Sequence, residues 1–109
     1  MERLEFRFDG GRPALPTAKP QIVGVVASGN LEVLIEPAPQ DGACAIEINT
    51  AAHGFGDVWQ AVLLDFFDRH RVGAIRVSIN DAGATPAIVA LRLDQAIEAF
   101  TQRSRDIDA

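Results

Sequence analysis

Hydrophobic and polar residues alternate in four stretches of the chain. In residues 4–8, 31–36, 44–49 and 75–80 every second side chain is apolar, which predicts strands with one buried and one exposed face. A fifth stretch, residues 21–27, is nearly continuous β-branched hydrophobe and predicts a central strand covered on both faces. Gly24 interrupts this stretch, where it predicts a bulge or a close backbone contact.

Apolar residues at helical spacing predict a first helix over residues 57–70. Asp57 follows two glycines and suits the N-cap position, while Gly73 is expected to stop the helix. The predicted apolar face consists of Val58, Trp59, Val62, Leu63, Phe66 and Phe67.

A second helix is predicted near the end of the chain. Thr85 and Pro86 are typical of an N-cap and a first helical residue, and the helix is expected to end near Arg103. Beyond it, residues 104–109 are polar and are expected to fray. The apolar stripe consists of Val89, Leu93, Ala96, Ile97 and Phe100.

Two segments have the composition of connections. Residues 10–20 contain Pro13, Pro16 and Pro20, and because each proline removes a backbone donor we predict a Pro/Gly connector and not a strand. Residues 37–42 are predicted to be a loop.

A tight turn is predicted between the stretches 21–27 and 31–36. Ser28, Gly29 and Asn30 supply turn chemistry, since glycine accepts positive φ freely and asparagine tolerates it. The two flanking strands would then form a hairpin with a short loop and Ser28 at its apex.

The predicted fold is α+β: a single domain spanning residues 1–109, with a mixed, mainly antiparallel sheet of four to five strands and two helices on one face. The strand–helix–strand order over residues 44–80 implies a crossover, which is right-handed when its two strands are parallel. A chain of 109 residues with 48% hydrophobic residues is long enough to bury a core without disulfide or metal.

Charge and cysteine content narrow the classes of function. The net charge is −5 and the isoelectric point is about 4.8, so no nucleic-acid partner is expected. The N-terminal segment alternates charged and apolar residues, so neither a signal peptide nor a membrane partner is expected. Cys44 has no second cysteine to pair with and is interpreted as a small core residue. A cytoplasmic protein is the default expectation.

Catalytic and metal-binding patterns are weak. A Ser-His-acid set would have to come from Ser28, Ser78 or Ser104 with His53 or His70. The first histidine is expected on a surface loop, and the second in the last turn of a helix, where the helix dipole favours a cation. The sequence contains no nucleophile-elbow motif and no ligand spacing typical of zinc. We therefore predict no catalytic residue and no metal site.

Ser28 differs from the other serines, because only it is expected at the apex of two apolar strands. The residues alone are also compatible with a plain turn former, since serine is common in turns. Three interpretations remain open at this point: a covalent carrier, a non-catalytic interaction domain and a small stand-alone enzyme.

Two separated segments carry a family resemblance. Residues 24–37, Gly-Val-Val-Ala-Ser-Gly-Asn-Leu-Glu-Val-Leu-Ile-Glu-Pro, resemble the signature of the malonate decarboxylase acyl carrier proteins, the δ subunits of that enzyme. Residues 80–86, followed by 90–95, resemble the second characteristic segment of the same family. Ala27 and Asn30 stand where the family often has Gly and Asp. The citrate lyase acyl carrier is the alternative within this class.

The resemblance implies a role for Ser28. It would carry 2'-(5''-phosphoribosyl)-3'-dephospho-CoA through a phosphodiester, with acetyl or malonyl held as a thioester, and Gly29 would shape the turn and leave access to it. The implied partners are a carrier transferase subunit, the decarboxylase subunits and the transferase that attaches the prosthetic group. The chain itself would be a non-catalytic subunit, while a citrate lyase-type carrier or an interaction domain without a prosthetic group remains the alternative.

Overall fold

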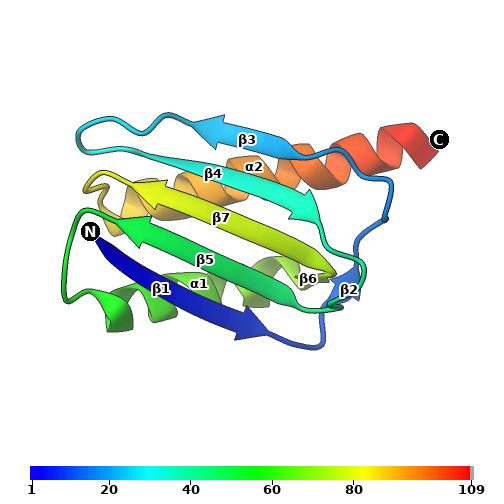
Figure 1. The fold of residues 1–109 in the computed structure, drawn as a ribbon. Helices are drawn as coiled ribbons and strands as arrows, with labels where there is room; N and C mark the ends of the chain where they lie inside the picture. Colours follow the sequence, from blue (N-terminus) through cyan, green and yellow to red (C-terminus); the bar gives the residue numbers. More distant parts are fainter. Residues whose placement is uncertain (109) are drawn as a thin grey trace.

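The computed structural model describes residues 1–108, with side chains up to Gln102. Its main sheet contains five strands. They are β1 (Glu2–Phe8), β3 (Gln21–Gly24), β4 (Leu31–Pro37), β5 (Cys44–Thr50) and β7 (Ile75–Asp81). Their order is β1-β5-β7-β4-β3 (Figure 1). The pair β5–β7 is parallel and the other three pairs are antiparallel.

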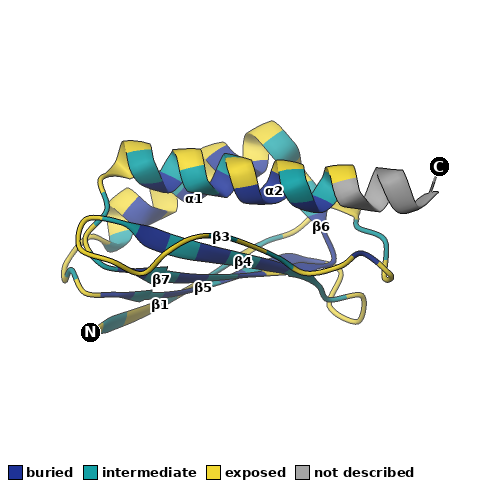
Figure 2. Cartoon of the chain, turned by 90° about the horizontal axis from the view of Figure 1, so that it is seen from above, coloured by how far each residue is buried: buried dark blue, intermediate teal, exposed yellow. Residues whose placement is uncertain are grey.

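Two helices, α1 (Gly56–His70) and α2 (Pro86–Asp108), cover the same face of this sheet (Figure 2). Period-two alternation turns the apolar residues of β4, β5 and β7 toward the helices, and full burial of one such side chain stabilises the fold by about 1.5–3 kcal/mol. The predicted α+β single domain is confirmed. The fully buried core side chains include Leu31, Val33, Ile35, Ile48, Leu63, Phe66, Leu93, Ile97 and Phe100.

The prediction of a central strand over residues 21–27 was wrong. β3 ends at Gly24 and is an edge strand, because β4 pairs with it on one side and with β7 on the other. Val25 and Val26 are 61% and 51% exposed. Gly24 does mark a close backbone contact: its φ is 88°, and a Cβ there would overlap the carbonyl oxygen of Leu31.

The connector over residues 10–20 contains a short strand that the sequence did not predict. β2 (Arg12–Pro13) pairs in parallel with β6 (Val72–Gly73). The backbone N–H of Arg12 donates to the carbonyl of Arg71 at 2.7 Å. Pro13 is tolerated because Arg12 and Ala14 supply the donors of this pair, the N–H of Ala14 donating to the carbonyl of Gly73 at 3.0 Å, and an edge strand needs no donor from its proline.

The bounds of α1 agree with the predicted 57–70 to within one residue, but the residues that cap the helix differ from the prediction. The N-cap residue is Phe55, whose side chain makes no capping bond. Asp57 lies within the first turn instead, where the helix dipole stabilises a negative charge. The helix ends at His70, as predicted, and its C-cap residue Arg71 adopts a left-handed conformation with φ 49°. Gly73 therefore does not stop the helix; it lies in β6 against the carbonyl oxygens of Gly11 and Gly42.

The start of α2 is as predicted. The hydroxyl oxygen of Thr85 accepts a hydrogen bond from the N–H of Ile88 at 3.3 Å, and Pro86 is the first helical residue. The helix continues to Asp108, beyond the predicted end near Arg103. The side chains of residues 103–109 lie outside the described part, and the predicted fraying of residues 104–109 stays a prediction.

Candidate functional site

Ser28 lies in the loop that joins β3 to β4 and projects at one end of the sheet, at the left of Figure 1. The loop comprises residues 25–30, so it is longer than the tight corner that the sequence predicted. Its tip is a β-turn in which the N–H of Asn30 donates to the carbonyl of Ala27 at 2.8 Å. Gly29 has φ 75°, and positive φ at the third turn residue alone is typical of type II. Ser28 is the exposed second residue.

One side of the Ser28 turn is fixed to the rest of the fold. The N–H of Gly29 donates to the carbonyl of Ala82 at 2.9 Å, and the N–H of Ala82 donates to the carbonyl of Asn30 at 2.9 Å. The side-chain oxygen of Asn30 accepts from the N–H of Leu31 at 2.8 Å. These bonds extend the β4–β7 pairing by one residue, so the turn is held beside the loop that leads from β7 into α2.

A buried carboxyl group holds that supporting loop in turn. Asp81 is 4% exposed and Thr50 is fully buried. The Thr50 hydroxyl donates to Oδ2 of Asp81 at 2.8 Å, and the N–H of Ala84 donates to Oδ1 at 2.9 Å. Thr50, at the end of β5, therefore holds Asp81, and Asp81 holds the loop in which Ala82 bonds to the Ser28 turn. Asp81 was not among the predicted site residues, although an Asp two residues before a glycine at a strand end is typical of an Asx turn.

The Ser28 hydroxyl makes no hydrogen bond within the described part of the chain. His53 is exposed in the loop after β5, as predicted. His70 is half-buried, and its Nε2 lies 2.9 Å from Oδ1 of Asp94, so the expectation of simple capping or solvent exposure was incomplete. His70 is the last residue of α1 and comes shortly before β7 in the chain. It therefore lies at the opposite end of the sheet from Ser28 (Figure 1).

The pKa of Asp94 reflects opposing influences. Burial alone would raise it, but hydrogen bonds from His70 and Arg69, together with their charges, hold the pKa of Asp94 below its ordinary value. The same contact, with a second from Asp65, raises the pKa of Arg69. Arg69 and His70 of α1 thus bind Asp94 of α2, and these contacts hold the two helices together.

Cys44 lies in the core, as the sequence predicted. Its side chain is fully buried, and burial raises the pKa of the thiol to about 12. Among the described residues there is no group of three or more His, Cys, Asp or Glu side chains that could hold a metal ion. In the same part of the chain, no helix combines the length and the apolar character needed to cross a bilayer.

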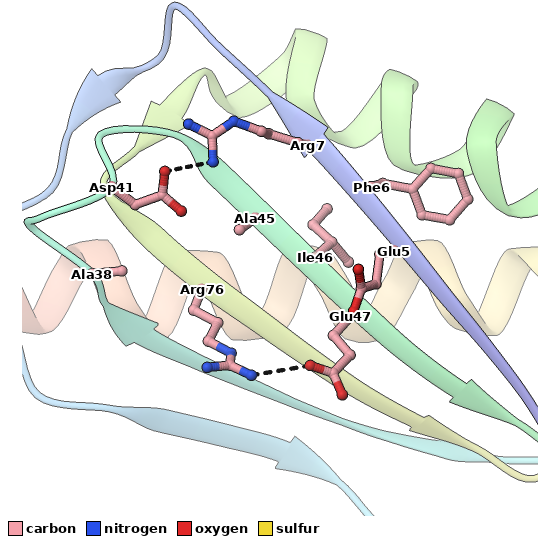
Figure 3. Close-up of a pocket in the computed structure, with 9 residues that line it drawn as sticks. All are labelled: Glu5, Phe6, Arg7, Ala38, Asp41, Ala45, Ile46, Glu47 and Arg76. Carbon is pink, nitrogen blue, oxygen red and sulfur yellow. Dashed lines mark hydrogen bonds and ion pairs between the residues drawn. The ribbon is translucent and has the colours of Figure 1, made fainter.

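The open face of the sheet carries a shallow hollow, lined by alternating charges (Figure 3). Arg7 forms an ion pair with Asp41, and Nη2 of Arg76 lies 3.0 Å from Oε2 of Glu47. Because the acidic and basic groups neutralise one another, the hollow presents mostly paired charge. It lies beside the start of β7, away from Ser28.

The fold and the site define a small α+β domain that presents an exposed serine hydroxyl on a supported hairpin turn. The family model described as malonate decarboxylase delta subunit (MdcD) matches residues 18–100. The chain belongs to this family, and the resemblance found in the sequence is confirmed.

Curated relatives and a solved structure agree with the family match. The chain is 60% identical over 98 residues to the malonate decarboxylase acyl carrier protein of Stenotrophomonas maltophilia (strain R551-3), covering 90% of this chain and 92% of the relative. It is 59% identical over 96 residues to the protein of the same name from Burkholderia cepacia, covering 88% and 87%. A crystal structure of a Pseudomonas malonate decarboxylase hetero-tetramer in complex with malonate contains a chain with TM-score 0.81 and 40% identity, covering 92% of this chain and 99% of that one.

Proposed function

We propose that this chain is the acyl carrier subunit of a malonate decarboxylase complex, and that it carries acetyl and malonyl thioesters on a phosphoribosyl-dephospho-CoA group attached to Ser28. The observation that carries the proposal is the position of Ser28: exposed, at the second position of a turn, on a loop hydrogen-bonded to the rest of the fold. The family match and the relatives' names support the malonate system over the citrate alternative.

The residues around Ser28 fit a covalently attached arm. The neighbouring Gly29 has no side chain, and even an added Cβ there would meet nothing within 4 Å, so the surroundings leave room for a bulky substituent. The turn requires glycine at position 29, because a residue with a Cβ at this positive φ would destabilise the fold by about 1–2 kcal/mol. When bound, the arm supplies a terminal thiol that holds the acyl group as a thioester.

The chain's own contribution is positioning. The bonds between Gly29, Ala82 and Asn30 fix the attachment point, while the arm beyond it moves between active sites at high effective concentration. We propose that partner subunits supply the catalytic groups: a carrier transferase, the decarboxylase subunits and the transferase that attaches the arm. The hetero-tetramer of the Pseudomonas structure supports an assembly of this kind. A cytoplasmic location stays a prediction.

Intact mass spectrometry after co-expression with the attachment enzymes tests the proposal. We expect a mass increase of one phosphoribosyl-dephospho-CoA unit, lost in Ser28→Ala and retained in the matched control Ser78→Ala. An adduct that persists in Ser28→Ala would refute the site. Stable association with partner subunits without any adduct would favour an interaction domain, and malonate turnover by the purified chain alone would favour an enzyme.

A further inference from the structure

An apolar groove lies at the same end of the molecule as Ser28, between the N-terminal ends of α1 and α2. It has a volume of about 380 Å³, within the range of about 300–1,000 Å³ usual for small-molecule sites. Phe55 and Val58, at its rim, are 51% and 43% exposed. The other apolar side chains along it are Ala52, Trp59, Val62, Ala84, Pro86 and Val89.

The groove and Ser28 share one structural wall. Asp81, Gly83 and Ala84 line the groove, and Ala82, between them, forms the two backbone hydrogen bonds with the Ser28 turn. A group attached to Ser28 therefore starts beside the groove. It can enter from the surface without any opening of the core.

We propose that this groove is a resting site for the apolar end of the arm on Ser28, and that it holds the free thiol or the acetyl thioester but not the malonyl thioester. The inference rests on the proposed attachment at Ser28. The occupant is part of the same molecule, so its local concentration is set by the length of its tether. Effective concentrations for short flexible tethers are millimolar, so even a millimolar intrinsic affinity keeps the groove about half occupied.

Selectivity for the acyl group follows from the lining. No Lys, Arg or His is among the described residues that line the groove. The carboxylate of a malonyl group would lose its hydration there without gaining a cation, and burial of an unpaired charge is strongly unfavourable. Asp81, the acidic residue of the lining, offers the malonyl carboxylate no donor either, because its carboxyl oxygens accept hydrogen bonds from Thr50 and Ala84. An acetyl group brings no such charge.

The consequence is a carrier that differs between its two acyl states. The acetyl form keeps its thioester against the protein while it waits for exchange. The malonyl form extends its arm into solvent, where a decarboxylase active site can take it up. The groove thus favours delivery of the form that is to be decarboxylated.

Trp59 provides a direct readout, since it is the only tryptophan of the chain and lies in the groove wall with 6% of its surface exposed. The experiment compares four forms: unmodified, thiol, acetyl and malonyl. We expect a shift of Trp59 emission, together with methyl NMR shifts of Val58, Val62 and Val89, in the thiol and acetyl forms. The malonyl form is expected to match the unmodified protein.

A pair of matched variants locates the effect. Val58→Glu places a charge at the groove rim and is expected to abolish the acetyl-dependent shifts. Leu64→Glu alters another exposed apolar residue of α1, 47% exposed and outside the groove, and is expected to retain them. Far-UV circular dichroism confirms that both variants fold.

Intact mass separates the two possible failures. Absence of an adduct on Ser28 would refute the proposed function. A loaded acetyl form whose Trp59 emission and valine methyl shifts equal those of the unmodified protein would overturn the groove as resting site. Equal shifts in the acetyl and malonyl forms would overturn its selectivity.

Discussion

Replacing Asp81 with alanine tests how the Ser28 end of the sheet is held. The substitution removes two hydrogen bonds, from the Thr50 hydroxyl at 2.8 Å and from the Ala84 N–H at 2.9 Å. Hydrogen bonds to a charged group contribute about 1.5–3 kcal/mol each, and an unsatisfied buried donor costs about 1–3 kcal/mol. Thr50 is fully buried, whereas Ala84 is only half-buried and its N–H can find water. We expect a loss of about 2–4 kcal/mol, a large part of a typical total of about 5–15 kcal/mol.

The assay is urea unfolding followed by circular dichroism. Asp57→Ala is the matched control, because Asp57 is an exposed acidic residue in the first turn of α1 and its loss should cost at most about 1 kcal/mol. A double-mutant cycle of Asp81→Ala with Thr50→Val should give a coupling of about 1–3 kcal/mol. A cost for Asp81→Ala no larger than for Asp57→Ala, or a cycle without coupling, would refute this reasoning.

Three further predictions concern stability and reactivity. Gly24→Ala should lower the free energy of unfolding by about 3 kcal/mol or more in urea titrations, because positive φ and overlap with the backbone add; Gly42→Ala, also at positive φ but in open space, should cost only about 1–2 kcal/mol. Asp94→Asn should cost about 1 kcal/mol at pH 7. The pKa of Asp94 is lower in the folded state than in the unfolded chain, so the stability that Asp94 contributes is present above the unfolded pKa of about 3.9 and is lost as pH falls through the folded pKa. In acid denaturation the stabilities of variant and wild type should therefore converge below about pH 4. A stability difference that grows there would contradict this sign. The Cys44 thiol, with its pKa raised to about 12, should react with a thiol reagent at pH 8 only in denaturant, and rapid labelling of the native protein would contradict its burial.

Period-two and helical patterns predicted most of the sheet and both helices. They failed where the structure depends on which strands lie next to one another, because the local sequence does not show this. The β-branched residues of the 21–27 stretch predicted a strand but not its place in the sheet. Gly24 ends the pairing through positive φ, which leaves Val25 and Val26 in an exposed loop. The pair β2–β6 has two residues in each strand, too short for any periodic pattern.

The candidate site was predictable only in part. Turn chemistry placed Ser28 at a hairpin tip, and the structure agrees, although the loop is longer. Its support was not predictable, because Ala82 lies 54 residues along the chain from Ser28. Only the antiparallel register, with Leu31 opposite Asp81, brings the two loops together. Similarly, the contact of His70 with Asp94 depends on how α1 and α2 pack.

Attachment of the arm to Ser28 is tested most directly by fragmentation mass spectrometry of the loaded protein after proteolysis. We predict that the phosphodiester-linked adduct is on the peptide containing Ser28, and that base treatment converts this one residue to dehydroalanine by β-elimination. Peptides containing Ser78 or Ser104 should be unmodified. An adduct on either of those serines, or a Ser28 that stays unmodified in a catalytically active complex, would contradict the attachment at Ser28.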